Sequence, residues 1–339
     1  MPPRYTPPYT ITSSILSSVA EIGAEIGRLT ARQETRTAPL LRRQNRIRSI
    51  HASLAIENNT LSLDQVTAII SGKRVLGPPR EIQEVKNAYA AYEALPSWNP
   101  ASSKDLLAAH RLMLHGLAED AGKFRRGSVG IAKGKQLVHL APPASRVPAL
   151  IKDLLGWLKH TDAHPLIAGC VFHYELEFIH PFTDGNGRVG RLWQTLILSR
   201  WHPIFTFLPV EAVIRDQQAS YYKVLAACDK SGNSTAFAEF LLAALLLVLR
   251  NSAGTDQVSD QVSDQVKALL HTLRRDTLSA LECMKRLKLA HRPTFRKNYL
   301  SPALSSGLIE YTIPEKPQSR LQRYRLTSQG HALLSIPKS

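Results

Sequence analysis

Hydrophobic residues recur at spacings of three and four over most of the first 250 residues, as they do on one face of an α-helix. Good helix formers fill the positions between them, and the alternation typical of strands is sparse. Ser62, Ser102 and Ser145 precede apolar segments as candidate N-caps. The pattern predicts a mainly α fold with helices over residues 12–31, 38–58, 62–71, 80–94, 102–117, 145–160, 164–180, 186–201, 216–228 and 235–250.

One segment interrupts this helical pattern. Residues 127–141 place glycines between two short apolar stretches, and Pro142 and Pro143 follow directly. Glycines between apolar runs and a terminating proline pair are typical of a β-hairpin. We therefore expect a small hairpin within the helical region.

The last part of the chain has a different order of elements. Helical spacing covers residues 264–273, 277–288 and 293–306, and strand-like runs follow at Leu308–Ile313 and Leu321–Leu326. Three helices and a hairpin are the order of a winged helix-turn-helix. The sequence thus predicts a small α+β domain of this kind after the helical bundle.

These elements suggest four parts, consistent with about two domains for 339 residues. We expect an N-terminal extension and helix at 1–36, a helical domain at 37–250, a linker at 251–263 and the winged helix-turn-helix domain at 264–339.

The charge balance points to an anionic partner. The formal net charge is +16, and residues 271–339 hold 13 Lys and Arg against 4 Asp and Glu, a net +9. Such a basic domain is typical of nucleic-acid binding, although a solvated basic surface or a protein-binding winged helix also fits. A DNA or protein partner of this domain is therefore expected.

Cysteine usage and hydropathy bear on location. Cys170, Cys228 and Cys283 lie far apart in apolar helical contexts, which predicts buried thiols in a reducing cytosol. The N-terminus lacks the apolar core of a signal peptide. The longest apolar run, Phe240–Leu249, is too short to span a bilayer. We expect a cytoplasmic protein with no membrane partner.

The most informative segment lies between two apolar helices and reads His180-Pro-Phe-Thr-Asp-Gly-Asn-Gly-Arg-Val-Gly-Arg191. Gly185 and Gly187 flank Asn186 where the second helix begins, so the backbone there can approach a ligand closely. A helix N-terminus exposes unpaired N–H groups and a partial positive charge. This junction is therefore a candidate phosphate cradle.

Four side chains of the same segment add chemistry. Arg188 and Arg191 are three residues apart on one helix face, so both guanidinium groups can reach one polyphosphate. Asp184 supplies a hard oxygen ligand for Mg²⁺. His180 is the side chain suited to accept a proton near neutral pH. Together these groups are typical of a site for phosphoryl or nucleotidyl transfer.

Other kinds of site fit less well. A calcium loop starting at Asp184 would need acids where Arg188 and Thr195 stand. His173, Glu177 and His180 share a helix face but do not form a His-Glu-x-x-His zinc motif. A glycine-rich loop with a purely structural role would need neither the histidine nor the arginines.

The segment from His180 to Arg191 resembles the full signature of the Fic family, His-Pro-Phe-x-(Asp/Glu)-Gly-Asn-Gly-Arg-x-x-Arg, and every specified position matches. The similarity extends over roughly residues 40–250. It implies a Fic-type helical bundle with a β-hairpin flap, and a protein adenylyltransferase that uses ATP and Mg²⁺ to move AMP onto a Ser, Thr or Tyr hydroxyl of a protein. Family members often dimerise, so a homodimer is a further expectation, as is self-modification, although the sequence itself does not indicate the oligomeric state.

The resemblance assigns a role to each residue of the loop. His180 would deprotonate the hydroxyl, which attacks the α-phosphate while pyrophosphate leaves. Asp184 would hold Mg²⁺, Arg188 would bind the β-phosphate and Arg191 the γ-phosphate. The ATP-binding positions carried over from the motif are Asp184, Gly185, Asn186, Gly187, Arg188, Val189, Gly190 and Arg191.

The hairpin at 127–141 would be the flap, which docks the target by main-chain pairing. Tyr221 and Tyr222 match the family's tyrosine pair near the adenine, although ordinary core aromatics also fit them. The residues expected near the nucleotide outside the loop are Ile131, Ala132, Tyr221, Tyr222 and Asp229.

A second motif, Ser53-Leu-Ala-Ile-Glu57-Asn58, resembles the family's inhibitory pattern (Ser/Thr)-x-x-x-Glu-(Gly/Asn). Ser53 and Glu57 are one helical turn apart and face one way. Glu57 would pair with Arg191 and occupy the γ-phosphate position, so that helix 38–58 inhibits the domain. A helix end capped by Asn58 and Asn59 explains the same residues. Members of this class can also remove AMP.

The sequence is consistent with two functions. The first is an autoinhibited protein adenylyltransferase. The alternative is a DNA-binding transcriptional regulator whose Fic domain senses a nucleotide, with helix 293–306 in the major groove. The basic tail motivates the second, and the complete loop signature favours the first.

Overall fold

The chain divides into two compact units, Met1–Ala253 and Gly254–Ser339, in the computed structural model. The structure describes residues 5–33, 39–128, 130–133, 136–255, 264–274, 276–315, 319–327, 330–331 and 334.

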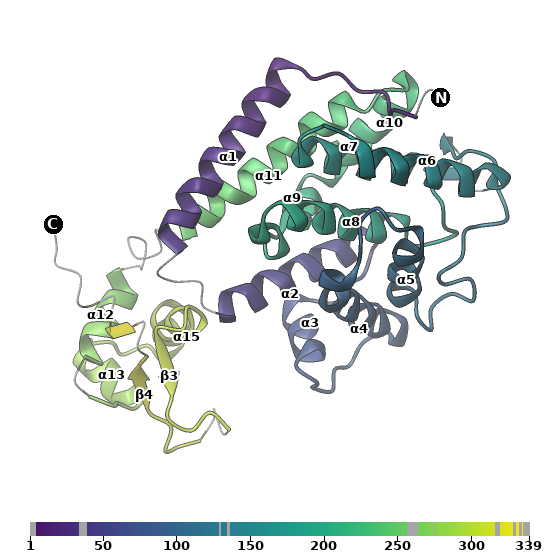
Figure 1. Ribbon diagram of the computed structural model, residues 1–339. Helices are drawn as coiled ribbons and strands as arrows, with labels where there is room; N and C mark the ends of the chain where they lie inside the picture. Colours follow the sequence, from purple (N-terminus) through teal and green to yellow (C-terminus); the bar gives the residue numbers. More distant parts are fainter. Residues whose placement is uncertain are drawn as a thin grey trace. The chain divides into compact units, whose positions relative to one another are not determined.

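The first unit is a bundle of helices (Figure 1). Its α-helices are α1 (Ser13–Gln33), α2 (Pro39–Ile56), α3 (Leu63–Ile70), α4 (Pro79–Ala94), α5 (Ser103–Met113), α6 (Val147–His160), α7 (Pro165–Ile179), α8 (Asn186–Trp201), α9 (Val210–Asp216), α10 (Gln218–Ser231) and α11 (Thr235–Thr255). Short 3-10 turns are η1 (Leu95–Ser97), η2 (Ala144–Arg146) and η3 (Pro203–Thr206). The mainly helical fold class predicted from the periodicity is confirmed.

Local sequence explains where several helices begin. The side chain of Ser62 accepts a hydrogen bond from the first turn of α3, and Ser102 does the same for α5, so both predicted caps are confirmed. The prediction for Ser145 was wrong, because this residue lies in η2. Helix α6 starts after Arg146 with Pro148 in its first turn, where the fixed φ of proline favours the helix.

Helix α9 was not predicted, and α10 begins after the start predicted at residue 216. Gln217 separates the two helices with φ −111° and ψ 26°, outside the helical region. Because α9 has only 7 residues, it is too short to show a helical period of its own.

Helices α7 and α8 pack against each other in the centre of this unit. Their side chains are almost continuously buried, from Leu166 to Leu176 in α7 and from Arg188 to Leu198 in α8. The loop between them is therefore held by two rigid elements. Helix α1 runs along α11, where Glu21 pairs with Arg250 (Figure 1).

The predicted hairpin is present. Strand β1 (Gly130–Lys133) pairs with β2 (Gln136–Leu140) in an antiparallel register that joins Gly130 to Leu140. The register shifts by one residue between Ile131 and Ala132, as in a β-bulge.

The second unit has its own core. It contains α12 (Asp264–Thr272), α13 (Ala280–Arg286), α14 (Arg292–Phe295), a π-helical turn η5 (Arg296–Leu300), α15 (Ser301–Ser305), β3 (Ile309–Tyr311) and β4 (Tyr324–Leu326). Helices α14, η5 and α15 follow without a break, and β3 pairs antiparallel with β4. The order matches the predicted three helices and hairpin, and the winged helix-turn-helix assignment stays a prediction.

Helix α11 extends further than expected. It continues through Thr255, so residues 251–255 are helical although a linker was predicted there. Adding residues to an existing helix costs little, which explains the extension through polar residues. The rest of the predicted linker, residues 256–263, lies outside the described residues.

The apolar and cysteine-bearing segments lie in the cores. The run Phe240–Leu249 belongs to α11, where Leu241 and Leu245 are fully buried. In the part of the chain that the structure describes, no helix has the length and apolar character to cross a membrane. The three cysteines are buried free thiols, as predicted: Cys170, Cys228 and Cys283.

Candidate active site

The loop between α7 and α8 begins with a left-handed residue. His180 has φ 49° and ψ 61°, and its N–H donates to the carbonyl of Leu176 at 2.9 Å. A non-glycine residue persists in this conformation only where its surroundings hold it. Nδ1 of His180 lies 3.4 Å from the carbonyl oxygen of Glu177. This contact favours a proton on Nδ1, which makes Nε2 the proton-accepting atom.

The loop closes where α8 begins. The side chain of Asn186 accepts from the N–H of Phe182 at 2.9 Å and donates to its carbonyl at 2.8 Å. Gly185 has φ 83°, and a Cβ there would lie 2.5 Å from Cδ2 of Leu114. The first N–H groups of α8 have no intrahelical partners and can bind an anion. Because its side chain closes the loop, Asn186 can contribute to such a site through its backbone.

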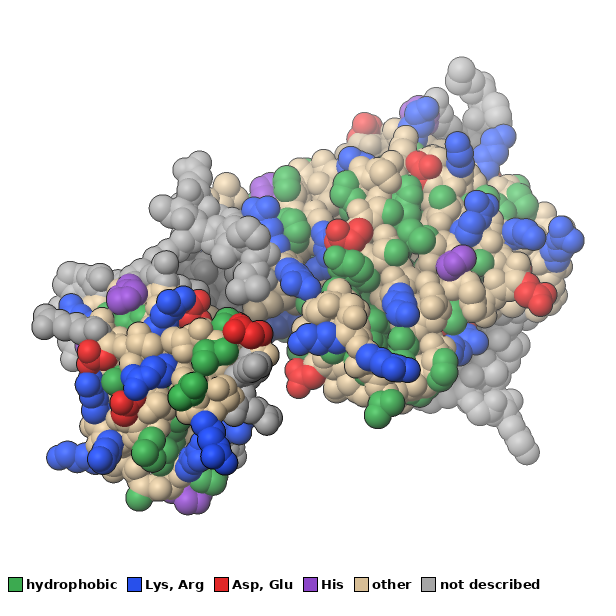
Figure 2. Space-filling model, turned by 90° about the horizontal axis from the view of Figure 1, so that it is seen from below, with side chains coloured by type: hydrophobic (Ala, Val, Ile, Leu, Met, Phe, Trp, Pro, Cys, Tyr) green, Lys and Arg blue, Asp and Glu red, His purple; other side chains and the backbone are tan. Residues whose placement is uncertain are grey.

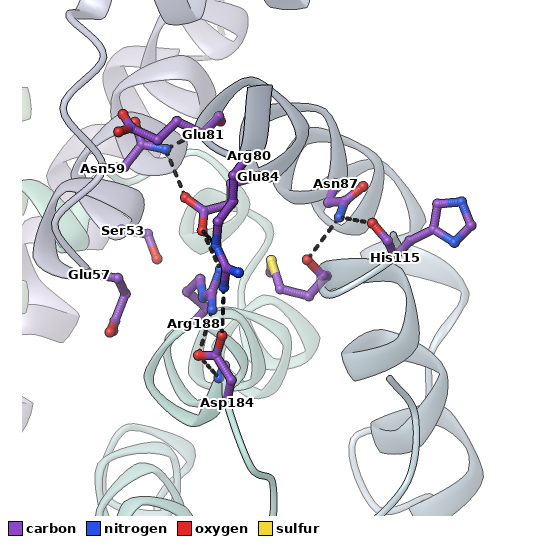
Figure 3. A network of polar contacts seen from close by, with 12 residues as sticks. Ser53, Glu57, Asn59, Arg80, Glu81, Glu84, Asn87, His115, Asp184 and Arg188 are labelled. Atoms are coloured by element: carbon purple, nitrogen blue, oxygen red, sulfur yellow. Dashed lines mark hydrogen bonds and ion pairs between the residues drawn. The ribbon is translucent and has the colours of Figure 1, made fainter. Parts of the chain in front are cut away.

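Asp184 and Arg188 meet two charged residues of α4 (Figure 3). Nη2 of Arg188 lies 2.8 Å from Oδ1 of Asp184, and its Nη1 lies 3.4 Å from Oε1 of Glu84. Nη2 of Arg80 lies 3.3 Å from Oδ2 of Asp184. The four groups alternate in charge. The guanidinium of Arg188, only 4% exposed, is therefore held by two carboxylates.

Helix α2 holds the second arginine of α8. Nε of Arg191 donates to Oγ of Ser53 at 3.0 Å, and Nη2 donates to the carbonyl of Ser53 at 3.0 Å and to Oε1 of Glu57 at 2.7 Å. Burial by itself would lower the pKa of Arg191, but the charge of Glu57 raises it above its usual value. The expected ion pair between Glu57 and Arg191 is thus present, and the guanidinium is charged.

The carboxylate of Glu57 also lies against the first turn of α8. A Cβ at Gly187 would lie 2.5 Å from Oε1 of Glu57 and 3.0 Å from Nη1 of Arg191. The N-terminal turn of a helix attracts anions through its free N–H groups and partial positive charge. The side chain of Glu57, in the turn directly after α2, therefore occupies the candidate phosphate cradle.

The end of α2 is tied to α4. Asn58 has φ 67°, a left-handed conformation that asparagine tolerates at helix ends. Nδ2 of Asn59 donates to Oε2 of Glu84 at 2.9 Å and to the carbonyl of Glu81 at 3.3 Å (Figure 3). The helix-end interpretation of this motif therefore agrees with the structure, and the same helix end carries Glu57 to Arg191.

The two tyrosines of α10 differ in their exposure to solvent. Tyr221 is 1% exposed, and its hydroxyl lies 3.2 Å from Nε2 of His173. Tyr222 is 46% exposed, and burial followed by the charge of Glu57 raises its pKa. Tyr222 is therefore available beside Glu57, whereas Tyr221 packs as a core aromatic. Asp229 accepts a hydrogen bond from Tyr174 at 3.0 Å.

Other residues that were predicted to contact ATP lie away from the surface of the loop. Val189 has no exposed surface, and a Cβ at Gly190 would lie 3.1 Å from Cδ2 of His173. The ATP contacts that the motif predicts for these two residues stay predictions. Ile131 and Ala132 belong to β1, and their side chains lie outside the described part of the structure.

Sequence reasoning missed His110 of α5. Its Nδ1 accepts from the N–H of Gly122 at 2.8 Å, so the proton lies on Nε2, which donates to the carbonyl of Asp184 at 3.0 Å. Its ring stacks on Phe182 with centroids 3.7 Å apart. A lone histidine within a helix gives no sequence signal of this role. Sequence reasoning likewise missed Arg125, which lies between α5 and β1 and donates through Nε to the carbonyl of His180 at 2.7 Å.

Sequence reasoning also missed Arg80 and Glu84. Their i, i+4 spacing on α4 is visible in the sequence and is typical of an ion pair on one helix. It does not show that both side chains face the loop.

Asp184 is the candidate metal ligand, and its carboxylate is 45% exposed. Among the residues that the structure describes, no three His, Cys, Asp or Glu side chains form a metal cluster. Proteins commonly hold Mg²⁺ by one or two carboxylates together with substrate phosphates and water. Asp184 therefore fits Mg²⁺ in combination with a bound triphosphate, once Arg80 has released Oδ2.

Comparison with protein families gives two matches. Residues 100–198 match the Fic/DOC family, and residues 264–327 match the C-terminal domain of the filamentation induced by cAMP protein Fic-like family. The first range contains the whole loop from α7 to α8.

Individual relatives agree with these matches. The chain is 34% identical over 190 residues to protein adenylyltransferase fic-1 of Caenorhabditis briggsae and 31% identical over 188 residues to protein adenylyltransferase Fic of Nematostella vectensis. Each match covers 52% of this chain, which spans 35% and 42% of those relatives.

Solved structures are also similar. A Fic family protein from Desulfovibrio desulfuricans G20 is 58% identical, with a TM-score of 0.74 over 96% of this chain and 99% of that one. Fic-1 of Caenorhabditis elegans is 25% identical, with a TM-score of 0.58 over 73% of this chain and 72% of that one.

Proposed function

This chain belongs to the Fic family, and we propose that it is a protein adenylyltransferase kept inactive by its own helix α2. In the proposed reaction, AMP moves from ATP to a serine, threonine or tyrosine hydroxyl of a protein. The observation that carries the proposal is the carboxylate of Glu57, which binds Arg191 and covers the first turn of α8. A site that holds one anion through a guanidinium and a helix N-terminus is chemically suited to a phosphate.

His180 is the proposed general base. Nε2 takes the proton of the target hydroxyl, and the oxygen attacks the α-phosphorus of ATP. The bond from that phosphorus to the bridging oxygen breaks, and pyrophosphate leaves. Two features support this role: the left-handed turn sets the direction in which the side chain leaves the backbone, and the contact of Nδ1 with the carbonyl of Glu177 leaves Nε2 to accept the proton.

The N-terminus of α8 is the proposed binding site for the triphosphate. The backbone N–H groups of Asn186 and Gly187 would donate to phosphate oxygens, with Arg188 at the β-phosphate and Arg191 at the γ-phosphate. Asp184 would hold a magnesium ion, which supplies charge neutralisation between the phosphates when it is bound. The burial of both guanidinium groups supports these roles, because a dry site strengthens their pull on the phosphates.

Inhibition follows from competition for the same donors. Glu57 and Ser53 together engage Nε and Nη2 of Arg191. A triphosphate that uses Nη2 of this guanidinium must displace Glu57. If ATP binds without that movement, its tail must shift, and the α-phosphate is then misplaced for attack.

The proposal extends to the target. Backbone groups of the hairpin β1–β2 would pair with an extended segment of the protein to be modified, and the chain would also modify itself. Glu57 would serve the reverse reaction, in which it aligns a water for removal of AMP. The homodimer expected from the resemblance stays a prediction.

Labelled ATP tests this function. We expect Glu57→Gly to incorporate AMP from α-labelled ATP into itself and into lysate proteins well above the wild type, and Glu57→Gly/His180→Ala to incorporate none. Equal labelling by the wild type and Glu57→Gly would remove the inhibitory role of α2. Mass spectrometry of the labelled proteins identifies the group, and any addition other than AMP would contradict the reaction.

The C-terminal unit favours a second function, binding of duplex DNA, with the Fic loop then sensing a nucleotide. From Cys283 to Ile309 the sequence has 6 Lys and Arg residues and no acidic residue. Arg292 and Arg296 are exposed one turn apart on the α14–η5 run. Lys and Arg side chains gather on the face of this unit in Figure 2, with acidic side chains between some of them.

Salt dependence of binding tests the DNA function. Neutralising phosphates releases counterions, so the logarithm of the affinity should fall linearly with that of the salt concentration. We expect Arg292→Ala/Arg296→Ala in the full chain to lower this slope. Arg325→Ala is the control, because Arg325 is engaged by Glu310. Binding that does not respond to salt would contradict the proposal.

A further inference from the structure

We propose that Arg125 is the positioning residue that aligns the general base with the hairpin that receives the target protein. The inference rests on the proposed function, which assigns the base to His180 and the target to the hairpin. Arg125 lies between α5 and β1 and is 3% exposed. Its guanidinium contacts three separate segments of the chain.

The first segment is the turn that carries the base. Nε of Arg125 donates to the carbonyl of His180 at 2.7 Å, and Nη2 donates to that of Ile179 at 3.3 Å. The backbone N–H of Arg125 donates to the carbonyl of Pro181 at 2.9 Å. One residue thus binds three consecutive carbonyl groups around the left-handed residue.

The other two segments are the ends of the hairpin. Nη1 of Arg125 donates to the carbonyl of Gly127, before β1, at 2.9 Å. Nη2 donates to the carbonyl of Pro142, after β2, at 2.5 Å. Because one planar group binds both ends of the hairpin and also the turn that carries His180, it fixes the position of the hairpin relative to that turn.

The chemistry of these contacts requires arginine. Among the described residues, no carboxylate lies at ion-pair distance from this guanidinium, so backbone carbonyls solvate its buried charge. A guanidinium offers five N–H donors in a fixed plane, whereas an ammonium is a compact charge without a preferred plane. Lysine at position 125 would keep the charge and lose the simultaneous contacts.

The expected effect falls on the transfer step. The groups proposed to bind the triphosphate are on α8 and in Asp184, and the described contacts of Arg125 are with other residues. Loss of the guanidinium should therefore leave ATP affinity intact while the base shifts relative to the target hydroxyl. A misplacement of about 1 Å can slow a reaction by about 10²-fold.

Variants of Arg125 in the full-length Glu57→Gly chain test this inference. We expect Arg125→Lys and Arg125→Gln to lower kcat for AMP transfer by roughly 10- to 100-fold. The Kd of a non-hydrolysable ATP analogue, measured by calorimetry, should stay within about threefold of the parent. Amide hydrogen exchange should quicken in peptides covering 124–128 and 178–183. Arg126→Lys and Arg126→Gln are matched controls, because Arg126 is the next residue and is exposed.

Three results would overturn the inference. One is parental kcat and parental hydrogen exchange in Arg125→Lys. The second is a rise of the ATP-analogue Kd that accounts for the whole loss of rate. The third is an equal loss in the Arg126 variants. If the Glu57→Gly parent transfers no AMP, the proposed function fails, but hydrogen exchange still decides whether Arg125 holds the turn and the hairpin.

Discussion

Replacing Glu57 by glutamine measures how strongly α2 holds the site closed. The substitution keeps the size of the side chain and removes its charge, so Arg191 loses a charged acceptor at 2.7 Å. Both contacts from Arg191 to Ser53 remain. The perturbation is therefore confined to one ion pair.

The structure sets the expected magnitude. The side chain of Arg191 is 1% exposed and that of Glu57 is 33% exposed, so the pair is mostly shielded from water. A hydrogen bond involving charged groups contributes roughly 1.5–3 kcal/mol. At about 1.4 kcal/mol per factor of ten, this corresponds to about 10- to 150-fold. Because the amide oxygen of glutamine can still accept from Arg191, we expect AMP transfer by Glu57→Gln to exceed that of the wild type by up to this factor at subsaturating ATP.

Initial rates with α-labelled ATP and a fixed acceptor protein provide the assay. The control is Glu93→Gln, because Glu93 pairs with Arg46 of α2 and not with Arg191. It removes an ion pair of α2 that is more exposed than the pair of Glu57 with Arg191, and it does not touch the site. A wild-type rate in Glu57→Gln would refute the reasoning. So would an equal gain in Glu93→Gln, which would show that any loosening of α2 suffices.

Three further predictions concern stability and pH. Gly185→Ala places a Cβ on a left-handed residue with φ 83°, and we expect the free energy of unfolding to fall by at least about 1–2 kcal/mol, measured by urea denaturation; an unchanged midpoint would contradict the geometry. Tyr92→Phe leaves the buried Glu211 without its 2.6 Å donor, and we expect a loss of about 1–3 kcal/mol in the same assay; no loss would mean that another group satisfies Glu211. Burial, and after it the charge of Arg215, lower the pKa of His51 in α2 below its unfolded value of about 6.5. The neutral imidazole therefore stabilises the fold above pH 6.5, and this contribution is lost as pH falls through the folded pKa. Inhibition is measured as the ratio of the AMP-transfer rate of Glu57→Gly to that of the wild type. We expect this ratio to fall below pH 6.5, and to stay constant with pH when both proteins also carry His51→Gln. The same pH profile with and without His51→Gln would exclude His51.

The candidate site was readable from sequence where its chemistry is local. The base, the acidic ligand and both arginines lie within the segment from His180 to Arg191, so spacing alone brings them together. The contact from Glu57 to Arg191 joins residues 134 positions apart, and spacing cannot predict it. It was expected because a second motif resembles the family's inhibitory pattern.

The motif assigned ATP contacts to adjacent residues whose side chains lie on different faces of α8. Val189 follows Arg188 directly, but only residues three or four apart share a helix face. The side chain of Val189 therefore points into the core, whereas those of Arg188 and Arg191 reach polar partners. A continuous sequence motif on a helix does not make a continuous surface.

The residues that the sequence did not reveal act through partners that leave no pattern in the sequence. Arg125 binds backbone carbonyls, which every residue has, so no side-chain type marks its partners. The same holds for His110, whose partners are the N–H of Gly122 and the carbonyl of Asp184. Such contacts depend on how distant segments pack, and only the folded chain reveals them.

The most direct test of the account is a crystal structure of Glu57→Gly with a non-hydrolysable ATP analogue and Mg²⁺. We predict the triphosphate over Gly187 at the N-terminus of α8, with the γ-phosphate on Arg191 and the metal on Asp184. The α-phosphate should then face Nε2 of His180. A triphosphate bound elsewhere, or one that leaves Arg191 without a phosphate contact, would contradict the central claim.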